Sequence, residues 1–276
     1  MIYLFHTPRP PLDRFVERLW LVADGAASRQ ERILPSGTLE LVINLREDRV
    51  RVDRTERCAS VQEYSGIVVS GTYSAAFVVD ASQHAAMMGV HFRPAGAPAV
   101  LGVPSAELTD AHVDLADLWS EAAARALRER LCDSASHRDR FHILERALID
   151  RIAAPPVPHP AVRLALACFG ADGCGASVRE VARRAGLSHR RLLTLFTDAV
   201  GLAPKRFCRV LRFQRVHATA QRTGRIDWTE LALRCGFYDQ AHLTNEFRRL
   251  SGLTPRQYEH ALEDRHHLLS GHVAMP

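Results

Sequence analysis

The chain has no apolar run long enough to cross a membrane. A spanning helix needs about 18 or more consecutive apolar residues, and no run in these 276 residues reaches that length. The first residues, MIYLFHTPRPP, also lack the basic segment followed by an apolar stretch that marks a secretory signal. We therefore expect a protein that does not contact membranes and works in the cytoplasm.

Cysteine is sparse, and its spacing carries no ligand motif. The six cysteines, none of which forms a CxxC pair or matches a zinc motif, are Cys58, Cys132, Cys168, Cys174, Cys208 and Cys235. Several lie among apolar residues, where a thiol behaves as a small hydrophobic group. We expect reduced cysteines in the core rather than metal ligands or disulfides.

Motifs that would indicate an enzyme are also missing. The sequence has no glycine-rich phosphate loop, nucleophile elbow or paired-carboxylate motif. Cys58 stands alone, unlike the cysteine cluster of a repair methyltransferase, and residues 1–105 lack the acidic pair of a phosphorylated receiver domain. His84 and His91 have no further histidine and carboxylate at ligand spacing. We expect neither catalysis nor a bound metal or cofactor.

The charge of the chain is unevenly distributed. Residues 156–276 contain 18 arginines and lysines against 10 aspartates and glutamates, a net charge of +8, whereas residues 1–155 contain 18 against 21, a net charge of −3. Between them, residues 153–160 read AAPPVPHP, where the prolines end one helix and prevent another from starting. We expect two domains, residues 1–155 and 156–276, of which the second has the charge to bind a polyanion.

Short apolar runs bounded by glycine, serine or proline fill the first part of the chain. Four of them, at residues 39–45, 67–69, 76–79 and 88–92, have the length and composition of β-strands. Several short strands without long helices between them favour a small antiparallel fold that is sandwich- or barrel-like.

Two helices are expected after these strands, at residues 115–133 and 137–153. In the second helix, an apolar stripe recurs at three- and four-residue steps through Phe141, Leu144, Leu148 and Ile152. Such a stripe can pack against the domain's own sheet or against a second copy of the chain. We favour the sheet for at least one helix and leave a homodimer open.

A repeat in the basic part of the chain carries the functional argument. One copy begins Val181-Ala-Arg-Arg-Ala-Gly-Leu-Ser188 and the other Leu231-Ala-Leu-Arg-Cys-Gly-Phe-Tyr238. In both, an alanine precedes a glycine by four residues, a phenylalanine precedes Gly-Leu-x-Pro by five, and an aromatic residue follows the proline by three. The two copies differ by one inserted residue in the turn.

Each repeated position has a use in a helix-turn-helix unit. Alanine lets a second helix cross closely, glycine can adopt positive φ and end the first helix, and a serine or aspartate can cap the next helix. Two apolar residues four positions apart then face the core. These positions are Ala182, Gly186, Ser188, Leu192 and Phe196 in the first copy and Ala232, Gly236, Asp239, Leu243 and Phe247 in the second. The repeat predicts an all-α C-terminal domain with two such units, and the whole chain is therefore expected to be an α+β protein.

The repeat also resembles a known family. Residues 160–262 resemble the AraC/XylS family of bacterial transcription regulators, above all over residues 236–258, GFYDQAHLTNEFRRLSGLTPRQY. The resemblance implies seven helices, with a long central helix at about residues 204–221 joining the two units. Residues 34–45 and 92–96 are similar to the companion domain of one AraC subgroup. In the family such domains sense a small molecule or mediate dimerisation.

The second helix of each unit is expected to enter the major groove of DNA. With Leu192, Leu195, Phe196, Leu243 and Phe247 buried, the opposite faces present His189, Arg190, Leu193, Thr194 and Thr197 on the first helix and Gln240, Ala241, Thr244, Asn245 and Arg248 on the second. Arginine can pair with guanine, asparagine or glutamine with adenine, and the apolar groups and threonines with thymine methyl groups. Arg190 could instead be a solvated residue and Asn245 a phosphate contact. Thr194 and Asn245 depart from the residues common in the family, which leaves the target sequence open.

Arginines also recur every three residues along the expected central helix, at Arg206, Arg209, Arg212 and Arg215. We expect some of them, Arg206 and Arg209 included, to meet DNA phosphates and others to form a solvated face.

Together these features predict a sequence-specific DNA-binding transcription regulator that inserts two recognition helices into successive major grooves of double-stranded DNA. Its N-terminal domain would sense a small-molecule effector, bind a second copy of the chain, or do both, and RNA polymerase is a further candidate partner. The alternative is a constitutive DNA-binding protein whose N-terminal domain only mediates protein contacts. A change in DNA binding caused by an effector separates the two.

Overall fold

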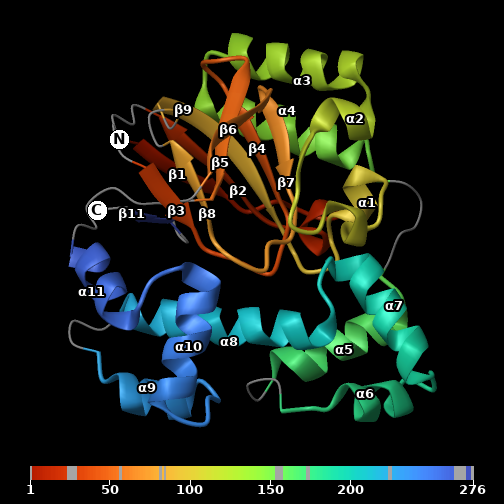
Figure 1. The fold of residues 1–276 in the computed structure, drawn as a ribbon. Helices are drawn as coiled ribbons and strands as arrows, with labels where there is room; N and C mark the ends of the chain where they lie inside the picture. Colours follow the sequence, from red (N-terminus) through yellow and green to blue (C-terminus); the bar gives the residue numbers. More distant parts are fainter. Residues whose placement is uncertain are drawn as a thin grey trace.

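The protein combines a β-rich part with a helical part that lies beneath it in Figure 1. The computed structural model describes residues 2–23, 30–55, 58–80, 83, 85–152, 158–171, 175–222, 226–263 and 272–274. The expected domain boundary falls largely on residues 153–157, which lie outside this described part, so the division at residue 155 stays a prediction.

Two antiparallel sheets form the β-rich part, and they stay open rather than closing into a barrel, so the sandwich-like alternative is confirmed. The six-stranded sheet has the order β1 (Ile2–His6), β2 (Val16–Ala23), β9 (Ala86–Phe92), β4 (Glu40–Asn44), β7 (Ile67–Ser70) and β10 (His112–Asp114). The five-stranded sheet has the order β11 (His272–Ala274), β3 (Gln30–Ile33), β8 (Phe77–Asp80), β5 (Arg49–Thr55) and β6 (Cys58–Ser65). All four strands expected from the sequence are present.

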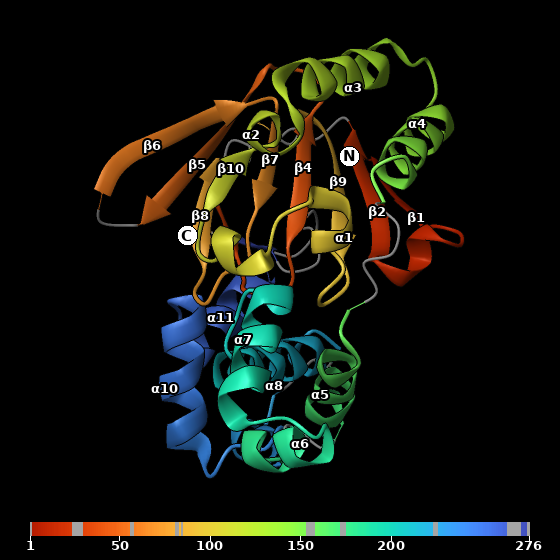
Figure 2. The same cartoon turned by 90° about the vertical axis from the view of Figure 1, so that its right-hand side faces the viewer.

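The six-stranded sheet is buried on both faces. Successive residues of β2 alternate between two cores: Leu19 and Leu21 pack toward the helices, whereas Trp20 and Val22 pack toward the second sheet. A strand covered on both faces reads as a continuous apolar run instead of an alternating one. The N-terminal part is therefore three layers deep, with helices, the six-stranded sheet and the five-stranded sheet in that order (Figure 2).

The helical layer differs from expectation at one point. The single helix expected at residues 115–133 is two helices, α2 (Leu115–Trp119) and α3 (Glu121–Asp133), because Ser120 adopts a φ of 141° and accepts a hydrogen bond from the amide of Ala123 as the cap of α3. Helix α4 (His137–Ile149) lies beside α3. Leu144 and Leu148 of α4 are fully buried in the core between the helices and the six-stranded sheet. The apolar stripe of this helix therefore packs against the domain's own sheet, which was one of the two alternatives. The short helices η1 (Leu12–Arg14), α1 (Pro98–Leu101) and η3 (Ser105–Leu108) complete this part.

Seven helices form the C-terminal part that the structure describes, and the central one is long, as the resemblance implied. They are α5 (Pro160–Gly170), α6 (Val178–Arg184), α7 (His189–Val200), α8 (Pro204–Ala220), α9 (Trp228–Arg234), α10 (Gln240–Ser251) and α11 (Pro255–Glu263). Helix α8 runs between the two helix-turn-helix units, with α5–α7 at one end and α9–α11 at the other (Figure 1). Across the described part of the chain, the helices are too short or too polar to span a membrane.

The helical C-terminal domain is confirmed, and one short strand follows its last helix. Residues 272–274 form β11, which pairs antiparallel with β3 and so completes the edge of the five-stranded sheet. Conversely, Leu34 and Ala95 of the N-terminal part are buried in the core of the C-terminal helices. The two parts are therefore joined by backbone pairing and by a shared apolar core.

The cysteines that the structure describes are free thiols at different depths. Cys235 is buried, and burial raises the pKa of its thiol, which keeps it protonated and unreactive. Cys132, Cys168 and Cys208 are half-buried, so the expectation of core cysteines is met fully at one position and in part at three. Cys174 and the side chain of Cys58 lie outside the described part.

Gly89 provides a test of the packing between the two sheets. It pairs with Trp20 across β2 and β9, and a Cβ at Gly89 would lie 2.4 Å from the indole ring. Because the ring is held in the inter-sheet core, we expect Gly89→Ala to lower the free energy of unfolding by about 1–3 kcal/mol, measured by urea denaturation. Gly170→Ala is the control, since no atom lies within 4 Å of its Cβ position. Equal effects of the two substitutions would contradict this account.

Candidate nucleic-acid interface

The turns of the two helix-turn-helix units share one hydrogen-bond pattern. Gly186 and Gly236 have φ values of 67° and 79°. In the first unit the amide of Leu187 donates to the carbonyl of Ala182 at 3.0 Å, and in the second the amide of Phe237 donates to the carbonyl of Ala232 at 2.9 Å. This arrangement ends a helix on a glycine in the left-handed conformation. The repeated alanine and glycine therefore build the same turn twice.

The second helix of each unit is also capped in the same way at both ends. The hydroxyl of Ser188 accepts from the amide of Arg191 at 3.2 Å, and the carboxylate of Asp239 accepts from the amide of His242 at 2.7 Å. At the other end, α7 and α10 stop at glycines with positive φ, Gly201 and Gly252. Both helices have 12 residues, so the two units present reading helices of equal length.

The expected buried and outward faces of α7 and α10 are largely as predicted. Leu192, Phe196, Leu243 and Phe247 are at most 2% exposed, and Leu195 is half-buried against the same core. Of the predicted DNA-facing residues, the fully exposed ones are His189, Arg190, Thr194, Gln240, Ala241, Asn245 and Arg248, and the half-buried ones are Leu193, Thr197 and Thr244. His189, Arg190, Gln240 and Ala241 lie in the first turns of their helices, where a reading helix meets base edges, whereas Thr194 and Asn245 lie near the middle and Arg248 lies in the last turn of α10.

Two of these side chains already have intramolecular partners. The hydroxyl of Thr194 donates to the carbonyl of Arg190 at 3.2 Å, so its hydrogen is already used within the helix. The carbonyl oxygen of Gln240 accepts from the hydroxyl of Thr229 at 2.9 Å, which orients its amide nitrogen as a donor. His242 lies edge-on to the ring of Phe237 and accepts from the amide of Tyr238, so its ring packs against the turn.

Tyr238 is a candidate that sequence reasoning missed. It is the residue inserted in the turn of the second unit, and it is 86% exposed directly before α10. A tyrosine at this place can donate to a phosphate or stack on a base, and tyrosine is among the side chains that contact the DNA backbone. The signal was present in the sequence as the one-residue difference between the two copies.

The arginines of α8 differ in their partners within the protein, while their contacts with DNA stay a prediction. Arg209, expected to meet phosphate, forms two hydrogen bonds at 2.5 and 2.7 Å with the carboxylate of Glu246 on α10, and both side chains are mostly buried. Arg212 lies over the ring of Phe237, and Arg215 donates to the carbonyl of Gly170. Arg206 is exposed. The three-residue spacing alone could not show that most of this row holds helices together.

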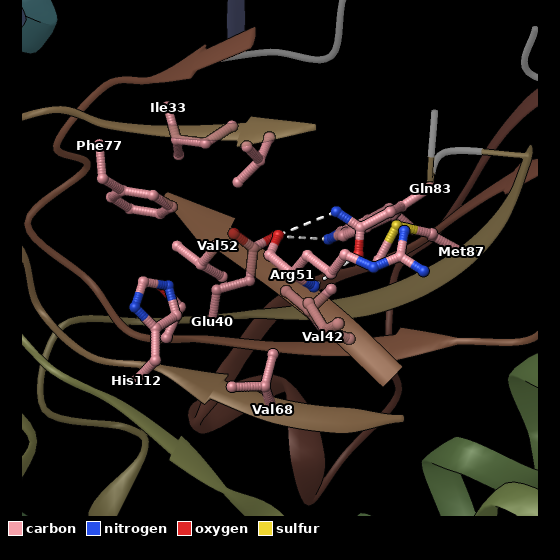
Figure 3. A pocket seen from close by; sticks show the side chains of 14 residues that line it. Ile33, Glu40, Val42, Arg51, Val52, Val68, Phe77, Gln83, Met87 and His112 are labelled. Atoms are coloured by element: carbon pink, nitrogen blue, oxygen red, sulfur yellow. Dashed lines mark hydrogen bonds between the residues drawn. The ribbon is translucent and has the colours of Figure 1, made fainter. Parts of the chain in front are cut away.

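A separate candidate site lies between the two sheets. This inter-sheet cavity has a volume of about 50 Å³ (Figure 3). Its lining combines apolar side chains with five polar ones, which are Glu40, Arg51, Ser70, Gln83 and His112. His112 is held by the hydroxyls of Tyr73 and Ser70. The carboxylate of Glu40 accepts from the indole nitrogen of Trp20 at 2.7 Å and lies 3.4 Å from His91.

A larger interdomain cavity continues from the inter-sheet cavity, since Ile33, Glu40, Ser70 and Phe77 line both. Its volume is about 260 Å³, close to the roughly 300 Å³ at which small-molecule sites begin. Gln214 of α8 forms part of its wall and donates to the carbonyl of Pro35 at 2.6 Å. A molecule bound there would contact both parts of the protein. Among the described residues no group of three His, Cys, Asp or Glu side chains could hold a metal ion, and His84 lies outside them.

Two families match separate parts of the chain. Residues 181–261 match a helix-turn-helix domain, and residues 4–114 match a domain of unknown function, DUF6597. A curated relative, the HTH-type transcriptional regulator Rv1931c of Mycobacterium tuberculosis, is 32% identical over 92 residues, which are 33% of this chain and 35% of the relative. The chain therefore spans about a third of the length of that relative.

Solved structures give similar matches. An AraC-type transcriptional regulator from Chromobacterium violaceum is 27% identical over 39% of this chain and 96% of that chain, with a TM-score of 0.35. ToxT from Vibrio cholerae, solved with a bound unsaturated fatty acid, is 7% identical over 93% of this chain and 94% of that chain, with a TM-score of 0.44.

The matched domain coincides with the repeated units. Residues 181–261 begin within α6 and end within α11, so they include both turns, both reading helices and α8. The matched proteins with assigned roles are regulators of transcription. Over this domain the chain is similar to helix-turn-helix transcription regulators, among them regulators of the AraC type.

Proposed function

We propose that the protein is a sequence-specific transcription regulator that reads two boxes of double-stranded DNA with α7 and α10. The observation that carries the proposal is the duplicated unit, whose two second helices are capped in the same way and present exposed polar side chains from their first turns onward. Arg190 and Asn245 are hydrogen-bonding side chains on these faces, suited to guanine and adenine. The +8 charge of residues 156–276 supplies attraction for phosphate.

Base reading by Arg190 and Asn245 is tested on one selected duplex and one scrambled duplex. We expect Arg190→Ala and Asn245→Ala each to cost about 1–3 kcal/mol on the selected duplex. On the scrambled duplex, Asn245→Ala should change little because asparagine is uncharged, and Arg190→Ala should lose only the effect of one charge. Binding constants come from fluorescence anisotropy with the full chain.

Arg191→Ala is the matched control for Arg190. Arg191 is an exposed arginine on the same turn of α7 but was not expected on the reading face. Its substitution should weaken binding to both duplexes by the same factor. If Arg190→Ala and Asn245→Ala also reduce the affinity for both duplexes equally, these two residues do not read bases.

Arg206 and Arg209 are expected to behave differently despite their spacing. Arg206→Ala should reduce the slope of log affinity against log salt by about 1, because one phosphate contact is lost, and should leave stability unchanged. Arg209→Ala should lower the free energy of unfolding by about 1–3 kcal/mol, because Glu246 loses a partner in a mostly buried site. Salt titrations from roughly 50 to 200 mM and urea denaturation measure the two effects. The same salt-slope change in both variants would show that Arg209 also meets phosphate.

We further propose that the regulator responds to a small polar effector bound in the interdomain cavity, within an N-terminal domain at residues 1–155 that acts on a DNA-binding domain at residues 156–276. The cavity is lined by charged side chains of both signs, Glu17 and Glu40 on one hand and Arg18 on the other, together with His91. Because Gln214 lies on the wall and belongs to α8, occupancy of the cavity reaches the helix that carries both units. A constitutive DNA-binding protein would not require a contact between the cavity and α8.

The effector proposal predicts a DNA affinity that changes with metabolite. We expect fractions of a metabolite extract to change the affinity of the full chain for the selected duplex, and Thr38→Trp, which fills the cavity, to abolish that change while leaving basal DNA binding intact. Ala135→Trp, at an exposed site between α3 and α4, is the control. An affinity that no fraction alters would favour the constitutive alternative.

A second copy of the chain and RNA polymerase stay proposed partners. Strand β1 lies at the edge of the six-stranded sheet, and Phe5 on it is 52% exposed, which suits pairing with another strand. Sedimentation of the protein with and without DNA would give its oligomeric state. Transcription from a template carrying the selected boxes would show whether polymerase is recruited or blocked.

A further inference from the structure

The C-terminal end of α7 is held by three hydroxyl groups of the N-terminal part. Thr72 donates to the carbonyl of Val200 at 3.0 Å, Ser105 to that of Ala199 at 2.8 Å, and Thr109 to that of Gly201 at 2.5 Å. The last carbonyls of a helix have no partner within the helix. Here the neighbouring domain supplies those partners, so the end of α7 is fixed in place by another part of the fold.

The C-terminal end of α10 is held by the same part of the protein. The amide of Ala76 donates to the carbonyl of Leu250 at 2.7 Å, and the guanidinium of Arg32 donates to that of Ser251 at 3.0 Å. Arg32 is 5% exposed, and a cation at this end of a helix is favoured by the helix dipole. Equivalent ends of the two reading helices therefore dock on one surface.

The repeated Gly-Leu-x-Pro motif is what permits this docking. A Cβ at Gly201 would lie 2.7 Å from the hydroxyl oxygen of Thr72, and one at Gly252 would lie 2.2 Å from a guanidinium nitrogen of Arg32. Each glycine also has a positive φ that ends its helix. A residue with a side chain at either place would push the reading helix away from the N-terminal part.

These contacts close a ring of rigid elements. Helices α7 and α10 pack on opposite ends of α8, and their C-terminal ends meet the N-terminal part, which also touches α8 through the hydrogen bond between the carbonyl of Pro35 and the side chain of Gln214 (Figure 1). A single helix joining two units can bend and twist. A second connection through the β-rich part removes that freedom.

We propose that Thr72, Ser105, Thr109 and Arg32 are positioning residues that set the distance and rotational phase between the two reading helices, and thereby the spacing of the DNA boxes that the protein accepts. The inference rests on the proposed reading of two boxes by α7 and α10. The docked ends lie about 17 Å from the N-terminal ends of the 12-residue helices. The N-terminal part therefore holds both helices without covering their reading ends.

Spacing tolerance measures this role directly. Each inserted base pair moves the second box by about 3.4 Å and a tenth of a turn. We expect the full chain to lose about tenfold or more in affinity when one base pair is inserted or deleted, the loss of a base-reading contact. Thr72→Val/Ser105→Ala/Thr109→Val should bind the best spacing nearly as well but lose about threefold or less for the same change, as flexibly linked modules do.

The variants are chosen to keep the fold intact. Valine preserves the shape of threonine, and thermal unfolding checks that each variant is folded. The single variant Thr109→Val should show the same relaxation of box spacing, but a smaller one. Ser65→Ala/Ser134→Ala removes two hydroxyl-to-carbonyl hydrogen bonds within the N-terminal part and should retain the strict spacing. Arg32→Lys, which keeps the charge, should relax the spacing less than Arg32→Met.

The outcomes separate the inference from the proposed function. If the full chain selects no sequence or reads a single box, the reading of two boxes fails. If it selects two boxes at one spacing and the folded triple and single variants keep the same profile as the control, the positioning role of these residues is overturned while the proposed function stands. Relaxed spacing with unchanged preference within each box supports the inference.

Discussion

The buried face of α8 is the constraint on which both helix-turn-helix units depend. Phe207, near its start, packs edge-on against Phe196 of α7 at 5.5 Å, and Phe213, farther along, packs against Phe247 of α10 at 5.1 Å. Each unit is too short to bury its own apolar face, so the aromatic side chains of α8 complete both cores. The ion pair between Arg209 and Glu246 then fixes the rotation of α10 about this contact.

Much of the C-terminal part could be predicted because its determinants are local. A cap, a glycine with positive φ and two apolar residues four apart act within a dozen residues, and the sequence repeats them. The strands were predictable for a similar reason, since apolar runs bounded by turn residues show their own limits. The break at Ser120 was not, because a serine within an apolar-periodic stretch can lie in a helix or start a new one.

The rest depends on partners that are distant in the sequence. Nothing near Arg209 or Arg206 distinguishes the arginine that binds a carboxylate 37 residues away from the one that stays exposed. Likewise, Thr72, Ser105 and Thr109 follow no periodic pattern, and their role emerges from carbonyls more than 90 residues later. Residues 34–45 and 92–96 were linked to a companion domain, and in the fold Leu34, Pro35 and Ala95 adjoin the C-terminal helices.

The pairing of β11 with β3 has a consequence for biosynthesis. Roughly 240 residues separate the two strands, which at about 5–20 residues per second is an interval of roughly 10 to 50 s on the ribosome. During that time β3 is made but its outer edge has no strand beside it, and an open edge is a template for pairing with other chains. The newly made protein thus depends on β11 to close a sheet whose other strands were translated first.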